Sequence, residues 1–247
     1  MAPVTTVDKA LDVLFHLLAE PAPVGVSSLG RSLGLPKASA HRLLASLQRR
    51  DLVEQDESGR YRPGFGLVAL GLGVLDREPL IAVARPILEA ESASLGETTF
   101  LVAPRAGSLT VLDKVEGTGF LRAAPRVGEK VPAHATAVGK LFLLEDGGLL
   151  PETRPLERFT AHTPRSRKEL SRATRRSAEQ GWAHNRDEWI EGLSVVAAPV
   201  STRGQLVAAV AVATSTPRMD ALGPDVVARR AIAAAGRIGR RLEGRRS

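Results

Sequence analysis

Residues 26–50, with the sequence VSSLGRSLGLPKASAHRLLASLQRR, predict two short helices joined by a tight turn. Ser27 is placed to cap the first helix, and Gly34 can take the left-handed backbone conformation that ends it. Pro36 suits the first turn of the second helix, where its missing N–H group costs nothing. The apolar residues of this second helix fall on one face at helical spacing, namely Ala40, Leu43, Leu44 and Leu47. The segment therefore predicts a helix-turn-helix.

The opposite face of the second helix carries positive charge, because no acidic residue occurs between Lys37 and Arg50. Four side chains at its N-terminal end are suited to contact base edges and phosphates in a major groove, namely Lys37, Ser39, His41 and Arg42. A plain amphipathic helix in a bundle would show the same pattern, so this helix alone leaves both interpretations open.

The flanking segments favour the DNA-binding interpretation. Apolar residues at helical spacing upstream predict a supporting first helix, capped by Thr5 or Thr6. Downstream, residues 52–64 predict a β-hairpin with its turn at Gly59. Three helices followed by a hairpin predict a winged helix-turn-helix domain over residues 1–65.

The hairpin adds two cations to the predicted DNA-binding surface, because Arg60 and Arg62 lie on its returning strand and can each reach a phosphate. The full set of predicted DNA-contacting residues is Ser27, Lys37, Ser39, His41, Arg42, Arg60 and Arg62. Residues 1–76 contain 8 Lys or Arg and 8 Asp or Glu, so their formal charges cancel. The predicted attraction to DNA therefore depends on the local positive charge of the DNA-contacting residues rather than on the net charge of the domain. The net charge of +7 arises later, around Arg165–Arg176 and Arg229–Arg246.

The rest of the chain predicts an apolar linker helix followed by an α+β domain. The linker, residues 66–78, contains Gly66, Gly71 and Gly73. Each interior glycine lowers the stability of a helix by about 1 kcal/mol relative to alanine. Further helices are expected over Leu80–Leu95, Ala135–Leu144, Ser166–Gln180 and Asp225–Leu242. Strands are expected over Thr98–Val102, Leu109–Val115, Gly119–Ala124, Leu193–Val200 and Gln205–Thr214, the last two as a hairpin around residues 202–204. The fold class is therefore α+β.

Several stretches, in the same order, resemble the IclR family of bacterial transcriptional regulators over about 220 residues. The N-terminal ones are VDKAL at 7–11, LGLPK at 33–37, AHRLL at 40–44 and GRY at 59–61, and the later ones include GEKVPAHATAVGK at 128–140, GWA at 181–183 and AAPV at 197–200. The resemblance implies a homodimer or dimer of dimers that binds double-stranded operator DNA under the control of a small-molecule effector. It also implies that residues 79–247 form a GAF-like effector domain, an antiparallel sheet with helices on one side and a ligand pocket on the other.

The resemblance places the effector pocket between the start of the 135–144 helix and the segment that leads into the next core strand. By position, the resemblance carries over Ala137, Val138, Asn185 and Val195, with Leu193 lining the pocket, and Thr136 at the helix start completes the predicted set. Asn185 stands where the family commonly has an acid and Val195 where it commonly has a cysteine, so this pocket is expected to be less charged and more apolar. Backbone N–H groups at the helix start favour a carboxylate, and the Thr136 hydroxyl can add a hydrogen bond. Leu193 and Val195 fit ordinary strand core equally well.

No catalytic or metal-binding pattern stands out in the sequence. The five histidines lack H-x-x-x-H spacing, His134 is expected to be structural, and there is no cysteine to complete a zinc site. We expect no enzyme activity, no cofactor and no metal. A ligand-independent regulator, with the C-terminal domain as an oligomerisation scaffold, remains the alternative.

Two expectations concern the surroundings of the chain and of the pocket. The sequence has no signal-peptide pattern and no apolar run of membrane-spanning length, so we expect a cytoplasmic protein without a membrane partner. Asp187, Glu188 and Glu191, which follow Asn185, are expected to lie in a solvated turn.

Overall fold

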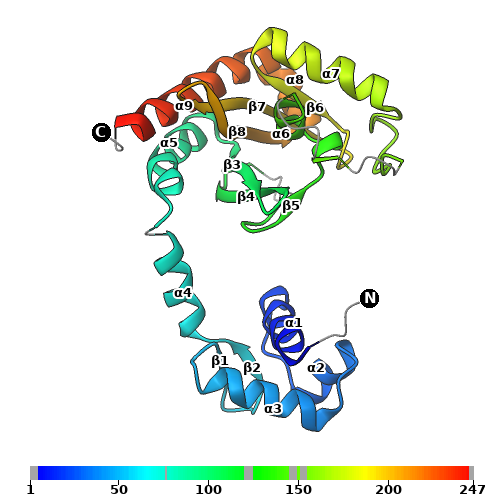
Figure 1. Cartoon of the computed structure of the whole chain (residues 1–247), viewed down its shortest axis with the longest axis vertical. Helices are drawn as coiled ribbons and strands as arrows, with labels where there is room; N and C mark the ends of the chain where they lie inside the picture. The colour runs from blue at the N-terminus through cyan, green and yellow to red at the C-terminus, as the bar shows by residue number, and fades with distance from the viewer. Residues whose placement is uncertain (1–4, 76, 120–124, 145–148, 151–154, 245–247) are drawn as a thin grey trace. The chain divides into compact units, whose positions relative to one another are not determined.

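The computed structural model describes residues 5–75, 77–119, 125–144, 149–150 and 155–244 (Figure 1). The chain forms two compact units, Met1–Arg77 and Glu78–Ser247. Each combines helices with antiparallel strands, as the predicted α+β class requires. No helix in the described part of the chain is long and apolar enough to cross a membrane.

The first unit is a winged helix-turn-helix. Its elements are α1 (Thr6–Ala19), α2 (Val26–Ser32), α3 (Lys37–Gln48), β1 (Val53–Gln55) and β2 (Tyr61–Pro63). The four apolar residues predicted for α3 are all buried, and its three leucines pack with Val13, Leu17 and Leu29 from the other two helices. Thr5 begins α1 through a capping box with Asp8, in which each residue's side chain bonds the other's backbone amide.

The turn between α2 and α3 confirms one local prediction and corrects two. Gly34 has a φ angle of 63°, the left-handed conformation expected there. Ser27 is not a cap, because α2 begins at Val26 and its N-cap is Gly25, which has no side chain to bond the first amides. Ser27 is exposed inside the first turn. Pro36 is the N-cap of α3 rather than part of its first turn.

Helix α4 (Phe65–Leu75) closes the first unit with apolar side chains in solvent. Phe65 is 73% exposed and Val74 is 61% exposed. Gly66 is closely packed, because a β-carbon there would lie 2.8 Å from the carbonyl oxygens of Arg50 and Asp51. Apart from the backbone of α4 and the adjacent residues, no atom in the described part of the chain lies within 4 Å of a β-carbon placed at Gly71 or Gly73.

We expect Gly71→Ala and Gly73→Ala each to stabilise α4 by about 1 kcal/mol, because alanine has the higher helix propensity and its methyl group meets nothing. Amide hydrogen exchange of residues 67–75 should slow about fivefold in each variant. Gly66→Ala is the matched control and should lower stability through its clash with the Asp51 carbonyl. Faster exchange in the Gly71 or Gly73 variant would contradict this account.

The second unit is built on a six-stranded antiparallel sheet of order β5-β4-β3-β8-β7-β6. The strands are β3 (Thr98–Arg105), β4 (Ser108–Val115), β5 (Lys130–Val131), β6 (Ala183–Arg186), β7 (Leu193–Thr202) and β8 (Gln205–Ser215). The predicted β7–β8 hairpin is present, with its turn at Arg203 and Gly204. The predicted strand over 119–124 lies almost entirely outside the described residues.

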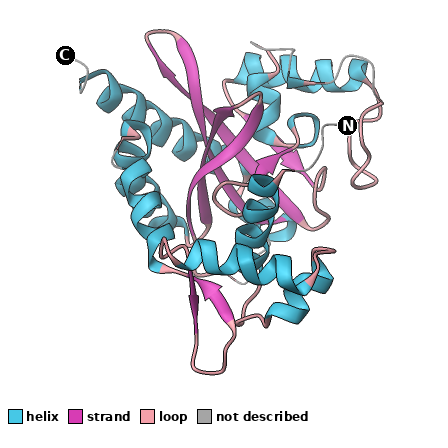
Figure 2. Cartoon of the chain, turned by 60° about the horizontal axis from the view of Figure 1, so that its bottom comes forward, coloured by secondary structure: helices cyan, strands magenta, loops and turns pink. Residues whose placement is uncertain are grey.

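Helices cover both faces of this sheet, whereas the resemblance implied helices on one face only. On one face lie α5 (Pro79–Leu95), α8 (Thr216–Leu222) and α9 (Pro224–Gly244), of which α5 and α9 run along the strands (Figure 2). On the other lie the 3-10 turn η1 (Ala133–Ala135) and α6 (Ala137–Phe142), while α7 (Arg167–Gln180) packs against α6 and β6. Side chains alternate along each strand, so Val196 joins the α9 core and Val195 packs on the α6 core.

Candidate functional site

Helix α3 presents a cationic face opposite its buried stripe. Lys37, His41 and Arg42 are exposed, and Ser39 is half-buried. Arg42 Nη2 donates a hydrogen bond to Ser39 Oγ at 3.3 Å, which directs the guanidinium toward the N-terminal end of the helix. These side chains occupy the end of a recognition helix that normally contacts base edges.

The wing places its two predicted arginines differently. Arg62 lies on β2, opposite Glu54, and its Nε is 2.6 Å from Glu54 Oε1. Both side chains are exposed, so this ion pair contributes little to the stability of the domain. Arg60 is not on the strand as predicted, because it immediately precedes β2. Its amide donates to Asp56 Oδ1 at 2.9 Å, and hydrogen bonds from Ser58 and Arg60 lower the pKa of Asp56.

A cavity in the second unit brings the two predicted walls of the effector pocket together. All six predicted pocket residues line it, namely Thr136, Ala137, Val138, Asn185, Leu193 and Val195. Its volume is about 40 Å³. Leu193 and Val195 belong to the apolar core of this face as well, so they are both core and lining.

Sequence reasoning missed seven further lining residues among those that the structure describes, of which two are Pro125 and Val131. Phe100 and Val102 come from β3, Ala211 and Ala213 from β8, and Trp189 from the loop between β6 and β7. The period-two alternation of β3 and β8 marks which of their residues share a face. No local signal shows that these strands lie beside β7.

The polar side chains of the cavity are already hydrogen-bonded within the protein. Thr136 caps α6, since its Oγ1 accepts from the Gly139 amide at 3.1 Å and donates to the Pro132 carbonyl at 2.9 Å. Asn185 Nδ2 donates to the Ala135 carbonyl at 2.6 Å, and its Oδ1 accepts from the Glu188 amide at 3.0 Å. These bonds fix the wall of the cavity and leave a ligand mainly apolar surface to contact.

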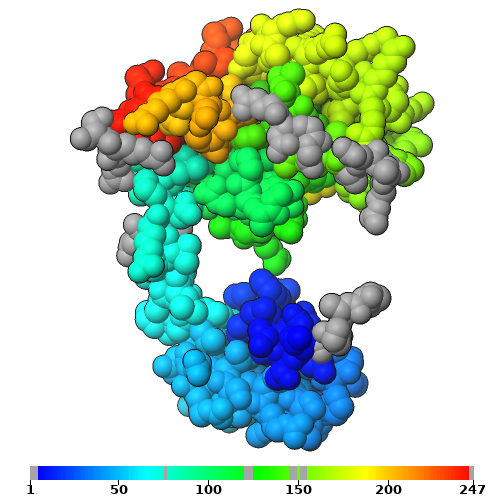
Figure 3. Space-filling view, viewed as in Figure 1, coloured from blue at the N-terminus to red at the C-terminus, as the bar shows by residue number. Residues whose placement is uncertain are grey.

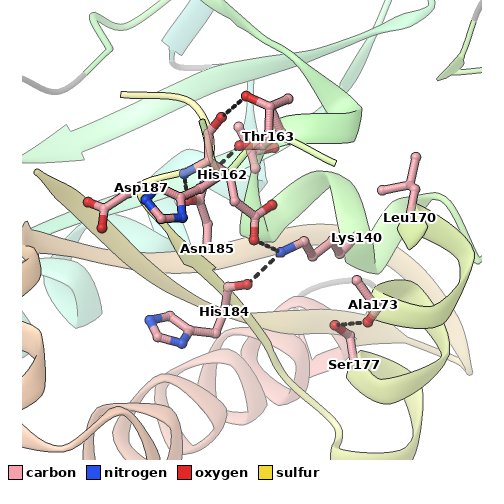
Figure 4. Close-up of polar contacts among 12 residues, drawn as sticks. Lys140, His162, Thr163, Leu170, Ala173, Ser177, His184, Asn185 and Asp187 are labelled. Atoms are coloured by element: carbon pink, nitrogen blue, oxygen red, sulfur yellow. Dashed lines mark hydrogen bonds and ion pairs between the residues drawn. The ribbon is translucent and has the colours of Figure 1, made fainter. Parts of the chain in front are cut away.

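A buried ion pair lies behind this wall (Figure 4). The side chain of Lys140, from α6, is 4% exposed, and its Nζ pairs with Glu188 Oε1 and donates to the His184 carbonyl at 2.7 Å. Burial lowers the pKa of Lys140 and raises the pKa of Glu188, and the opposite charge of each partner counters both shifts. The prediction that Glu188 lies in a solvated turn is therefore wrong.

The loop after β6 is held by several further hydrogen bonds. Asp187, at φ 59°, accepts from the Gly192 amide at 2.9 Å and from Thr216 Oγ1 at 2.6 Å. Thr163 Oγ1 donates to the Glu188 carbonyl at 2.6 Å. Asp187 is thus also bound within the fold, whereas Glu191 is exposed as expected.

The remaining candidate groups have structural partners. His134 Nε2 lies 2.8 Å from the Glu157 carbonyl oxygen, and its ring stacks on Phe159 with centroids 5.5 Å apart. This arrangement fits the structural role predicted for His134. Among the described residues, no group of three or more His, Asp or Glu side chains is placed to hold a metal ion.

The fold and the α3 surface define a two-unit, winged helix-turn-helix transcriptional regulator. Residues 6–57 match the IclR helix-turn-helix domain, and residues 72–240 match the bacterial transcriptional regulator IclR C-terminal family. The chain belongs to the IclR family of bacterial transcriptional regulators.

Individual relatives agree with this assignment. The chain is 30% identical over 223 residues to the HTH-type transcriptional regulator XynR of Escherichia coli K12, covering 88% of each. It is similar to the crystal structure of Thermotoga maritima IclR, with a TM-score of 0.83, 25% identity, and coverage of 96% of this chain and 98% of that one. An IclR homolog from Microbacterium hydrocarbonoxydans, solved with 4-hydroxybenzoate, has the same fold, with a TM-score of 0.82, 21% identity, and coverage of 97% and 100%.

Proposed function

We propose that this regulator binds operator DNA through α3 and the wing, and that a small molecule in the apolar cavity controls operator occupancy. Effector control is supported by one observation, namely that residues from two segments far apart in the sequence line the same cavity. A ligand that binds one arrangement of the assembly more tightly than another shifts the population toward it. DNA and ligand affinities are then coupled reciprocally.

The cavity favours a ligand with an apolar body. Its lining is apolar apart from Thr136 and Asn185, whose polar atoms are engaged internally. At about 40 Å³ it is far smaller than a typical ligand pocket, so binding requires a wall such as Trp189 to move outward. The 4-hydroxybenzoate complex of the Microbacterium homolog supports testing small carboxylic acids first.

A homodimer is supported by the exposed apolar residues of the first unit. On α1 they are Val7, Leu11, Phe15 and Leu18, and on α4 they are Phe65, Val68, Leu70, Leu72 and Val74. Both helices reach the surface in the space-filling view (Figure 3, dark blue and cyan). A second copy is the partner we propose for these faces, and its two-fold symmetry implies a palindromic operator. Light scattering distinguishes a dimer from a dimer of dimers.

Effector binding can be tested with a built-in reporter, because Trp189 lines the cavity and the chain has only one other tryptophan, Trp182. In a Trp182→Phe variant, a panel of small carboxylic acids including 4-hydroxybenzoate should contain one that changes Trp189 emission saturably. The same acid should change operator affinity in a footprinting or anisotropy assay.

Val195→Phe provides the matched control, because the larger ring projects into the cavity. It should abolish the emission response while ligand-free DNA binding persists, and Val195→Leu serves if the larger side chain prevents folding. A panel without any effect on Trp189 or on operator affinity would instead favour the ligand-independent regulator with a scaffold domain.

A further inference from the structure

A second and larger hollow lies along the outer edge of β6, between α7 and the start of α9. We call it the β6 groove, and its polar and aromatic lining comes chiefly from Lys140, Arg172, Arg176, Trp182, His184 and Arg186. Its volume is about 550 Å³, within the range of metabolite-binding sites. None of its lining residues lines the apolar cavity.

One strand separates the two sites. Asn185 of β6 is paired with Val195 and faces the apolar cavity, whereas His184 is paired with Val196 and faces the α9 side. Successive side chains of a strand point to opposite faces, so His184 and Arg186 line the groove while Asn185 does not.

The groove carries unneutralised positive charge. Arg172 and Arg176 lie one helical turn apart on α7, are exposed, and make no ion pair with any residue that the structure describes. Arg186 already binds Asp220 through its two terminal guanidinium nitrogens, Nη1 and Nη2. The acids in the lining are Glu188, which Lys140 neutralises, and Asp225.

The floor of the groove contains polar groups with unused bonding capacity. Lys140 Nζ has three N–H donors, and two of them are taken by Glu188 and the His184 carbonyl. The second carboxylate oxygen of Glu188, Oε2, is buried and has no hydrogen-bond partner among the described residues. Buried polar atoms without partners are rare in native proteins, so this floor is suited to a polar ligand.

We propose that the β6 groove binds a small polyanion, a molecule with at least two negative charges such as a dicarboxylate, a tricarboxylate or a phosphate ester. The guanidinium forks of Arg172 and Arg176 match the oxygens of either group. The third Lys140 donor contacts a further oxygen, and the indole of Trp182 covers the carbon skeleton.

The groove and the apolar cavity share β6 and the loop that follows it, so we expect ligand binding at one site to affect ligand binding at the other. Glu188 contacts Lys140 through its carboxylate and Asn185 through its amide. A polyanion that binds Lys140 therefore affects Glu188 and the loop that contains it. Trp189, which lines the apolar cavity, belongs to the same loop. The groove is a second input to the regulator, independent in its chemistry from the carboxylic acid proposed above.

The second tryptophan reports on this site. In a full-length Trp189→Phe variant, Trp182 is the remaining tryptophan, and citrate, succinate, inorganic phosphate and a sugar phosphate are titrated at constant ionic strength, with glycerol as the neutral probe. At least one polyanion should change Trp182 emission saturably. Tighter binding of carboxylates or of phosphates identifies which anion class the groove takes, and either result supports the proposal.

Surface variants test the geometry without endangering the fold. Arg172→Ala combined with Arg176→Ala should weaken binding by about tenfold or more, because charge-assisted hydrogen bonds are lost. Arg175→Ala removes an exposed arginine of the same helix that does not line the groove and should leave binding unchanged. Val195→Phe fills the apolar cavity, so a saturable Trp182 response that persists in this variant separates the groove from the effector cavity.

Two results would overturn the assignment. The first is the absence of saturable binding by every polyanion tested. The second is equal weakening by Arg175→Ala and by the double variant, which would indicate an adventitious ion only, attracted by the general charge of α7.

Discussion

Replacing Lys140 with methionine should destabilise the second unit by about 3–5 kcal/mol, because the Glu188 carboxylate then stays buried without its cation. Methionine keeps most of the apolar stem of lysine, so lost packing contributes little. Urea unfolding at pH 7, followed by circular dichroism, measures the effect. The double variant Lys140→Met with Glu188→Gln removes both charges and should recover much of the loss.

The single variant Lys140→Met should regain stability on acidification. Burial raises the pKa of Glu188 in the folded protein, and without Lys140 the opposing charge is gone, so the pKa rises further. The folded state then binds more protons than the unfolded state between the unfolded pKa of about 4.3 and the raised folded pKa. Stability therefore falls as pH increases through this window and is restored below it. A variant as stable as the wild type at pH 7 would show that Glu188 is not held by Lys140.

Arg42→Ala should weaken operator binding by about 1–3 kcal/mol, or roughly 5-fold to 150-fold, if Arg42 reads a base in the major groove. The loss should then be larger for the operator than for random DNA. A contact to phosphate alone would instead weaken all sequences together and reduce the salt slope by about one. Anisotropy titrations at several salt concentrations separate these cases.

Arg49→Ala is the matched control for Arg42. Arg49 also donates to a serine three residues earlier, Ser46, but it lies at the C-terminal end of α3. Recognition helices contact bases chiefly through their N-terminal residues, so Arg49→Ala should have the smaller effect on discrimination. Equal losses in the two variants would contradict the assignment of Arg42 as a base-contacting residue.

The elements that could be predicted from sequence are those that depend on the spacing of residues close together in the chain. The apolar stripe of α3 and the long β7–β8 hairpin follow from periodicity and turn residues over short stretches. The predicted start of α2 was wrong because both glycine and serine are common N-cap residues. Serine was preferred for its side-chain hydrogen bond, but the N-cap is Gly25. Thr136 was predicted to lie in the first turn of its helix, and it is the N-cap of α6 while also lining the cavity.

The buried ion pair could not be predicted in this way. Lys140 and Glu188 lie 48 residues apart, and Glu188 stands among charged residues that read as a solvated turn. Its burial depends on Thr163, which holds its carbonyl, and on the packing of α6 and α7 around β6. Only the tertiary arrangement brings these segments together. For the same reason the β3 and β8 residues of the cavity had no local signature.

The bond from Lys140 to the His184 carbonyl also has a consequence for solubility. β6 is the last strand of the sheet, so its outer carbonyl groups would otherwise be free to pair with a strand of another molecule. An ammonium bound at this position blocks such growth, and the opposite border strand, β5, is only two residues long. The lysine thus removes one acceptor that an added strand would need, which disfavours edge-to-edge pairing at β6.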